Sequence, residues 1–216
     1  MTYSQMPKSR IKRKRTILFV VSAPSGCGKT TLCNKLLKET PRLLRSVSFT
    51  TRRPRKGERD GVDYHFVSFE KFNALLKRGK FVEHAGVFGN FYGTPIEPLR
   101  RALRKNKDIL LSIDVKGAAQ IKKLFGAQSV SIFILPPSLA ALRKRLMKRR
   151  AESKEQISKR LAIAKKELSC LPRYDYAVIN RKLKDALFQL KAIIMAEQLK
   201  NKQPVFKGAG RAHKTK

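Results

Sequence analysis

Apolar residues gather in short runs along this 216-residue chain, and segments with helical spacing follow these runs. The runs cover residues 17–21, 109–113, 130–135 and 176–179, and they are rich in β-branched side chains, as strands are. Strands that alternate with helices predict a parallel sheet, because two parallel strands need a crossover connection between them. The pattern therefore predicts an α/β fold with helices covering a parallel sheet.

Two segments depart from this alternation. Residues 45–94 combine short alternating stretches, one helical stretch that begins at Ser68, and several glycines, which indicates a small mixed α+β insert. Farther along, Ser138 can cap a helix that runs through Arg150, and Ser153 with Gln156 forms a capping box for the next helix. Two helices are therefore expected to meet near residue 151.

A phosphate-binding loop is predicted between the first strand and the first helix, where residues 23–30 read Ala-Pro-Ser-Gly-Cys-Gly-Lys-Thr. Gly26 and Gly28 allow backbone N–H groups to converge on phosphate oxygens, and the helix N-terminus adds its unpaired donors. Lys29 can reach the β- and γ-phosphates, and the Thr30 hydroxyl can bind Mg²⁺. The general motif opens with glycine, whereas this chain has Ala23. Two alternative interpretations of this segment are an accidental glycine-rich turn and a secretory signal. Neither of them would require Gly-Lys-Thr at a helix start.

The composition is strongly basic, with 50 Lys and Arg against 15 acidic residues and a net charge of +35, which predicts a polyanionic substrate or partner. Segments 1–15 and 200–216 carry six basic residues each and no acid, yet the rest of the chain keeps 38 basic against 15 acidic residues. Three cysteines without a C-x-x-C pair fit a reducing compartment. We expect a cytoplasmic location and no membrane partner; organelle targeting by the basic N-terminus is the minor alternative.

The insert holds a second concentration of polar chemistry. Five basic residues fall within eight positions of segment 52–59, and Tyr64 follows them. Arginine offers forked donors that suit phosphate oxygens, so this stretch can clamp a phosphate. On composition alone a solvated basic loop is an equal alternative. Glu83, Tyr92 and Thr94 add a carboxylate, a phenol and a hydroxyl to the same insert and favour a binding site.

These motifs resemble the guanylate kinase family over roughly residues 16–199. The loop at 22–30 is similar to that family's phosphate loop, in which alanine at the first position is common, and segment 50–66 resembles its GMP-binding insert. The resemblance implies a P-loop NTPase-type parallel sheet flanked by helices, a mixed α+β GMP-binding insert at about 45–94 and a helical lid at about 138–165, between basic tails at 1–15 and 200–216. It also implies reversible transfer of the ATP γ-phosphoryl to GMP, with Mg²⁺ required.

The resemblance assigns roles to individual residues. The guanine would be faced by Ser48, Glu83 and Thr94, and the GMP phosphate would be held by Arg52, Arg55, Tyr64 and Tyr92. ATP would be bound by Ala23, Pro24, Ser25, Gly26, Cys27, Gly28, Lys29, Thr30, Thr31 and, near the adenine, Asn180. Catalysis would involve Lys29, Asp114, Arg149 and Arg160, and Mg²⁺ would be held by Thr30, with Asp114 acting through water. Guanine has two adjacent donors that one carboxylate can accept together, so Glu83 would select guanine over adenine.

Two positions depart from the family pattern. Ser112 stands where the family usually has an acid, and Lys116 stands where it usually has glutamine. Asp114 follows the predicted strand at 109–113, where a parallel sheet delivers a carboxylate toward Mg²⁺, although it can also serve as a helix N-cap. Of the two lid arginines, Arg149 lies in the cation-rich run 143–150, and so dense a run is usually a solvated face; Arg160 follows later, in the segment Lys159-Arg160-Leu161.

Two other functions are compatible with parts of the sequence. A non-catalytic guanylate-kinase-like interaction module would be expected to lack Lys29 or the arginines of the insert, and this chain has both. A basic P-loop protein that binds nucleic acid would use the positive charge, but no recognised RNA or DNA module is present. Weak, non-specific polyanion binding by the basic tails could accompany the kinase activity. The sequence does not indicate the oligomeric state.

Overall fold

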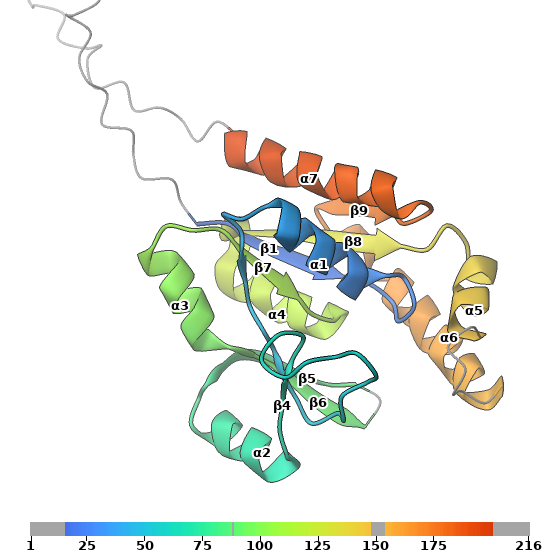
Figure 1. Ribbon diagram of the computed structural model, residues 1–216, viewed down its shortest axis with the longest axis horizontal. Coiled ribbons are helices and arrows are strands. Elements are labelled where there is room, and N and C mark those ends of the chain that lie inside the picture. The colour runs from blue at the N-terminus through green and yellow to red at the C-terminus, as the bar shows by residue number, and fades with distance from the viewer. Residues whose placement is uncertain (1–15, 88, 148–153, 201–216) are drawn as a thin grey trace, which may run out of the picture.

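The computed structural model describes residues 16–87, 89–147 and 154–200 (Figure 1). Five parallel strands form the main sheet in the order β2-β7-β1-β8-β9. Their bounds are Leu18–Ser22 for β1, Leu44–Arg45 for β2, Ile109–Ser112 for β7, Ser129–Leu135 for β8 and Tyr176–Ile179 for β9. The four predicted strands are confirmed, and β2 is an additional edge strand.

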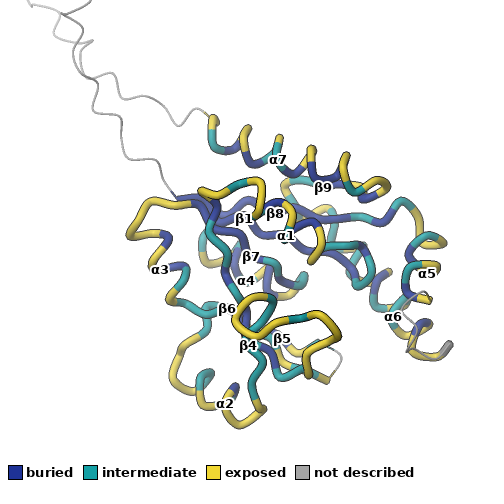
Figure 2. Tube along the Cα trace, in the orientation of Figure 1, coloured by how far each residue is buried: buried dark blue, intermediate teal, exposed yellow. Residues whose placement is uncertain are grey.

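Helices cover both faces of this sheet and divide the core into two clusters of buried residues (Figures 1 and 2). One face packs against α1 and α7, which span Lys29–Glu39 and Leu183–Leu199; the other packs against α3 and α4, which span Ile96–Arg104 and Val115–Phe125. Strand residues alternate between the clusters, with Phe19 in the first and Val20 in the second. The central strands are thus apolar on both faces, as expected of a parallel sheet.

The insert is a separate four-stranded mixed sheet with the order β4-β3-β6-β5. Its elements are β3 at Phe49–Thr50, β4 at His65–Phe66, α2 at Phe69–Lys77, β5 at Phe81–Val87 and β6 at Asn90–Pro95. Ser68 caps α2 by accepting a hydrogen bond from the Lys71 amide at 3.2 Å, as predicted. Stacked aromatic rings form its small core: the Phe72 and Phe81 ring centroids are 4.8 Å apart.

Two helices form the described part of the predicted lid, α5 at Leu139–Met147 and α6 at Lys154–Leu168. The Ser138 hydroxyl caps α5, because it accepts a hydrogen bond from the Ala141 amide at 3.0 Å. The predicted end of this helix at Arg150, the capping residue Ser153 and the catalytic candidate Arg149 lie outside the described residues. A short 3₁₀ helix, η3 at Leu171–Arg173, then leads into β9.

The buried carboxylate of Asp108, just before β7, joins the beginning of the described domain to its end. One of its oxygens accepts a hydrogen bond from the Ile17 amide at 2.9 Å, and the other accepts one from the Gln198 side chain at 2.7 Å. The start of β1 and the end of α7 therefore meet beside the start of β7.

Candidate active site

The phosphate loop runs from Ala23 to Gly28, between the end of β1 and the start of α1. Gly28 has φ of 86°, in the left-handed region that favours glycine, and a Cβ at this position would lie 2.5 Å from the Asn180 amide nitrogen. The loop itself is closed by a hydrogen bond from the Cys27 amide to the Pro24 carbonyl oxygen at 3.2 Å. Glycine at position 28 is thus required both by the backbone conformation and by packing.

Asn180, directly after β9, stabilises this loop by hydrogen bonding. Its side-chain amide donates a hydrogen bond to the Cys27 backbone carbonyl oxygen at 2.7 Å, and the Asn180 backbone carbonyl oxygen accepts one from the Arg145 guanidinium at 2.8 Å. Asn180 is buried and does not line the cavity described below, and neither does Cys27. The Cys27 thiol points into the core, where burial raises its pKa to about 12. Asn180 therefore supports the loop from outside, and Cys27 anchors it to the core from within.

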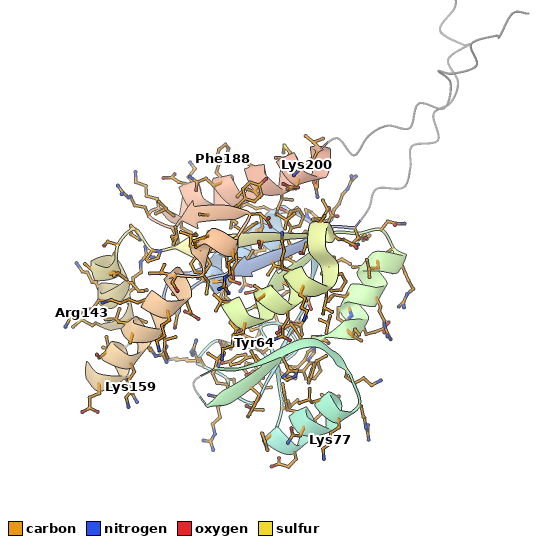
Figure 3. All side chains as sticks on the ribbon, turned by 180° about the vertical axis from the view of Figure 1, so that it is seen from behind. Tyr64, Lys77, Arg143, Lys159, Phe188 and Lys200 are labelled. Atoms are coloured by element: carbon orange, nitrogen blue, oxygen red, sulfur yellow. The ribbon has the colours of Figure 1, made fainter. Side chains whose placement is uncertain are left out.

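One cavity of about 320 Å³ joins the phosphate loop to the insert. It brings together most of the residues that the sequence predicted: Ala23, Pro24, Ser25, Gly26, Gly28, Lys29, Thr30, Thr31, Ser48, Arg52, Arg55, Tyr64, Glu83, Tyr92, Asp114 and Arg160. Figure 3 labels Tyr64, which lines the insert side of this cavity. Ser112, the departure from the family pattern, also lines it.

Lys29 begins α1 and extends toward β7. Its ammonium group donates a hydrogen bond to the carbonyl oxygen of Ile113 at 2.8 Å. Burial lowers the pKa of Lys29, an effect opposed by the neighbouring Cys33 and by carboxylates that include Asp114. The Asp114 side chain caps α4 by accepting a hydrogen bond from the Gly117 amide at 2.8 Å. The N-cap expectation for Asp114 is confirmed, and because the capping carboxylate also lines the cavity, its role toward Mg²⁺ stays a prediction.

Glu83, in β5, is buried at the insert side of the cavity. One of its oxygens accepts a hydrogen bond from the Thr94 hydroxyl on the neighbouring strand β6. Burial raises the pKa of Glu83 to about 7, although the Thr94 bond acts in the opposite direction. The carboxylate lies against α4 at Gly117, where any Cβ would clash with it. Thr94 is itself buried behind Glu83 and does not line the cavity.

The phosphate-clamp candidates are held in place by a partner that the sequence did not single out. Arg52 donates two hydrogen bonds to the Glu58 carboxylate, at 2.9 and 3.0 Å, and its guanidinium carbon lies 5.5 Å from the centre of the Tyr64 ring. The Arg55 amide also donates to Glu58, at 2.8 Å. Glu58 thus orders the loop that carries both arginines while leaving the Arg55 side chain exposed to the solvent.

Helix α6 reaches the phosphate loop from the lid. The Arg160 guanidinium donates a hydrogen bond to the Ser25 hydroxyl at 3.0 Å. Two turns farther along the same helix, Glu167 lines the cavity, and burial raises the pKa of its carboxyl to about 7. Sequence reasoning missed Glu167, because a single acid in a lysine-rich helix has no local signal that distinguishes it from a solvated one.

The phosphate loop joins the end of a parallel strand to the start of a helix, and it faces an insert that has its own basic clamp and a buried carboxylate. This arrangement defines a P-loop nucleotide kinase with a separate acceptor site. The sequence profile named Guanylate kinase matches residues 14–197. Because this match spans most of the chain, the chain belongs to the guanylate kinase family.

Individual relatives agree with this assignment. The chain is 46% identical over 192 residues to a guanylate kinase of Paramagnetospirillum magneticum, covering 89% of this chain and 90% of the relative. It is 47% identical over 184 residues to one of Wolbachia pipientis, covering 85% and 92%. The crystal structure of guanylate kinase from Anaplasma phagocytophilum superimposes with a TM-score of 0.75 at 38% identity, covering 88% of this chain and 89% of that one. The α/β fold with a mixed insert is therefore that of the family.

Proposed function

We propose that this chain transfers the γ-phosphoryl group of ATP to GMP, giving ADP and GDP, through the residues of the 320 Å³ cavity. The observation that carries the proposal is that this one cavity contains both the phosphate loop and the buried Glu83 of the insert. Two nucleotides bound at its two ends would meet with their phosphates between Lys29, Arg52, Arg55 and Arg160. Four cations there would offset the repulsion between two polyanions.

Guanine recognition is proposed for Glu83, supported by Ser48 and Thr94. The hydrogen bond from Thr94 holds one carboxylate oxygen, the other lies beside Gly117 of α4, and the carboxylate so fixed lines the cavity. An ionised carboxylate can accept from N1–H and from the exocyclic amine of guanine at once, whereas adenine presents an acceptor at N1. A buried carboxylate left unpaired by the wrong base is costly, so this contact discriminates strongly.

Acceptor-phosphate binding is proposed for Arg52, Arg55, Tyr64 and Tyr92. Glu58 holds the Arg52 fork beside the aromatic ring of Tyr64, which limits the rotamers that would have to be frozen on binding. The Arg55 side chain is exposed and lines the cavity, so it is available to a phosphate. The acceptor phosphate is itself the nucleophile, and no covalent enzyme intermediate is required.

The oxygen groups on the phosphate-loop side fit a magnesium ion. Thr30 lies on the first turn of α1 with an exposed side chain, Asp114 lines the same cavity, and hydroxyl and carboxylate oxygens are the ligands that Mg²⁺ prefers. Thr30 would hold the ion directly and Asp114 through water. Bound Mg²⁺ would neutralise charge on the β- and γ-phosphate oxygens.

For the lid we propose that Arg160 moves from Ser25 to the transferring phosphoryl group as ATP binds. Its present bond to the Ser25 hydroxyl already places the guanidinium at the phosphate loop. Arg149 is proposed for the same task from the lid segment outside the described residues. Lid closure would also exclude water that could otherwise hydrolyse ATP.

A coupled assay of ADP release with ATP and each of GMP, AMP, CMP and UMP tests the function. GMP should be used at least two orders of magnitude better than any other acceptor, by kcat/KM. No turnover with GMP would contradict the proposal and favour a non-catalytic interaction module. A cytoplasmic site of action is proposed as well, supported by three cysteines without a C-x-x-C pair, which fit a reducing compartment. No helix among the described residues is long and apolar enough to cross a membrane.

A further inference from the structure

Helix α7 carries an apolar lane on its solvent side that the kinase reaction does not use. Four side chains form it: Phe188, Ala192, Met195 and Leu199. Phe188 is 72% exposed, Met195 60% and Leu199 76%, so these are among the most exposed large apolar residues that the structure describes. Figure 2 shows the exposed outer edge of α7 above its buried inner edge, and Figure 3 labels Phe188 and, just past the far end of the lane, Lys200.

The spacing of the lane is that of a helix-pairing seam. Its residues are separated by four, three and four positions, which is the d-a-d-a pattern of two consecutive heptads. The inner face of α7 is equally apolar, with Ala186, Leu187, Leu190 and Ile194 packed in the core. A helix that is apolar on both faces is normally covered on both. The outer face of α7 therefore lacks a partner within the described part of this chain.

Charge indicates what kind of partner fits. The chain has a net charge of +35, yet the lane contains no charged residue. Of the lysines near it, Lys191 beside its middle donates a hydrogen bond to the Glu39 carboxylate at 2.9 Å, and the exposed Lys184 and Lys200 lie beyond its two ends. A nucleic acid or an acidic surface would be attracted to the cationic regions and would gain nothing from Phe188 or Met195. Two like-charged copies can approach closely only where charge is missing, as it is along this lane.

The order of side chains along the lane is self-complementary. An antiparallel pair of α7 helices related by a two-fold axis would set Phe188 against Leu199 of the second copy and Ala192 against Met195. Two large residues would then meet at each end, and at the centre a small alanine would face a methionine, which lets the helices approach closely there. The exposed Asp185 would lie within two residues of the second copy's Lys200, which adds an opposite-charge pair at each end.

From the palindromic spacing, the missing charge and the complementary ends, we infer that the lane on α7 is an isologous interface with a second copy of this chain. No α7 residue lines the catalytic cavity, so pairing leaves both sites open. A 17-residue helix is about 25 Å long, and one helix pair buries less than the roughly 800 Å² per partner of a standard interface. The dimer should accordingly form in the micromolar range.

Sedimentation velocity of the full chain tests this inference, over about 1 to 300 μM protein and in about 0.15 and 0.5 M NaCl. We expect a monomer–dimer equilibrium that strengthens with salt, because salt screens the repulsion between two cationic molecules. Met195→Glu and Phe188→Glu should each weaken dimerisation at least tenfold while leaving kcat for GMP unchanged. The matched control is Leu124→Glu, which changes an equally exposed leucine on α4 and should have no effect on association.

Three results would overturn the inference. The first is a wild-type chain that stays monomeric up to the highest concentration. If that chain dimerises only after residues 201–216 are deleted, its own C-terminal segment is the occupant of the lane, and the inference is equally overturned. The second is an equal loss of association in Leu124→Glu and Met195→Glu. The third is association that weakens with salt or disappears after ribonuclease treatment, because nucleic acid would then be bridging the copies.

Discussion

Glu83 is the residue on which acceptor choice depends in our proposal, and Glu83→Gln tests it with almost no change in size. The substitution replaces one acceptor oxygen with a donor, which would oppose the donors of guanine. We expect kcat/KM for GMP to fall by on the order of a hundredfold or more, with a much smaller change in the residual rate with AMP. Steady-state kinetics with both acceptors measure the effect, and equal losses for the two would remove Glu83 from base recognition.

The pH dependence of GMP binding follows from the same side chain. Because burial raises the pKa of Glu83 to about 7, the free enzyme increasingly holds it protonated below that pH, and a protonated carboxyl cannot accept both guanine donors. KM for GMP should therefore rise as pH falls from 8 through 7, approaching about tenfold per pH unit below the pKa, while KM for ATP changes less.

Two variants identify the titrating group in that experiment. Burial also raises the pKa of Glu167 to about 7, so Glu167→Gln should keep the pH dependence of KM for GMP, and Glu83→Gln should lose it. Titration of the GMP phosphate itself would persist in both variants, so the loss expected in Glu83→Gln is that of the enzyme's own contribution to the pH dependence. A pH profile that flattens only in Glu167→Gln would assign the titration to the lid helix instead.

Lys29 offers the corresponding test on the donor side. Removing its ammonium deletes a preorganised charge partner of the transferring phosphoryl group, so Lys29→Ala should lower kcat by at least about a hundredfold. Lys35→Ala, an exposed lysine on the same helix, is the matched control and should change neither kcat nor Tm. A folded Lys29→Ala variant with near-normal turnover would contradict the phosphate-loop assignment.

At the level of single elements, α6 presents Arg160 to the phosphate loop. Arg160→Ala should lower kcat roughly tenfold or more, since it removes one cation that would face the transition state. The neighbouring Lys159 is exposed and labelled in Figure 3, and Lys159→Ala should leave kcat unchanged. Similar losses in both variants, measured with saturating substrates, would show that the general basicity of the lid matters and not this contact.

The elements also show what sequence reasoning could reach. Strands β1, β7, β8 and β9 were predictable because each is a run of mostly apolar residues, and α2 because Ser68 marks its start. Strand β2 has two residues, too few for any periodicity, so only its pairing with β7 reveals it. Asn180 was expected near the adenine, but the sequence could not indicate that its side chain faces the Cys27 carbonyl.

Contacts between distant segments set the same limit within the cavity. Glu167 and Lys29 are 138 positions apart, and the lid helix must be in place before the carboxylate and the ammonium face one another. Gly117 was visible in the sequence as part of the segment after β7, but its packing against Glu83 depends on how α4 lies beside β5. Motif residues were thus predictable, and the residues that support them required the fold.

For the whole molecule, the question is what the two basic tails contribute. Two nucleotides need only the cations of the cavity, and polycationic segments attract nucleic acid by releasing counterions. Deleting residues 1–14 and 201–216 should leave GMP phosphorylation nearly unchanged while weakening retention on RNA or heparin and reducing the slope of log affinity against log salt. Measurements on both proteins across a salt series decide this. An unchanged slope would make the tails passive, and a large loss of turnover would make them part of the enzyme.

The junction at Asp108 bears on whether the elements of this domain could be joined in a different order along the chain. Because one carboxylate holds both Ile17 and Gln198, the two ends of the described domain lie close together. The entropy lost in closing so small a gap with a short linker is low, since loop closure depends on the length to be spanned. Circular permutation could therefore move the chain ends to an exposed turn such as Gly57 while every strand kept its neighbours. The fold would then not depend on the residue at which synthesis of the chain begins.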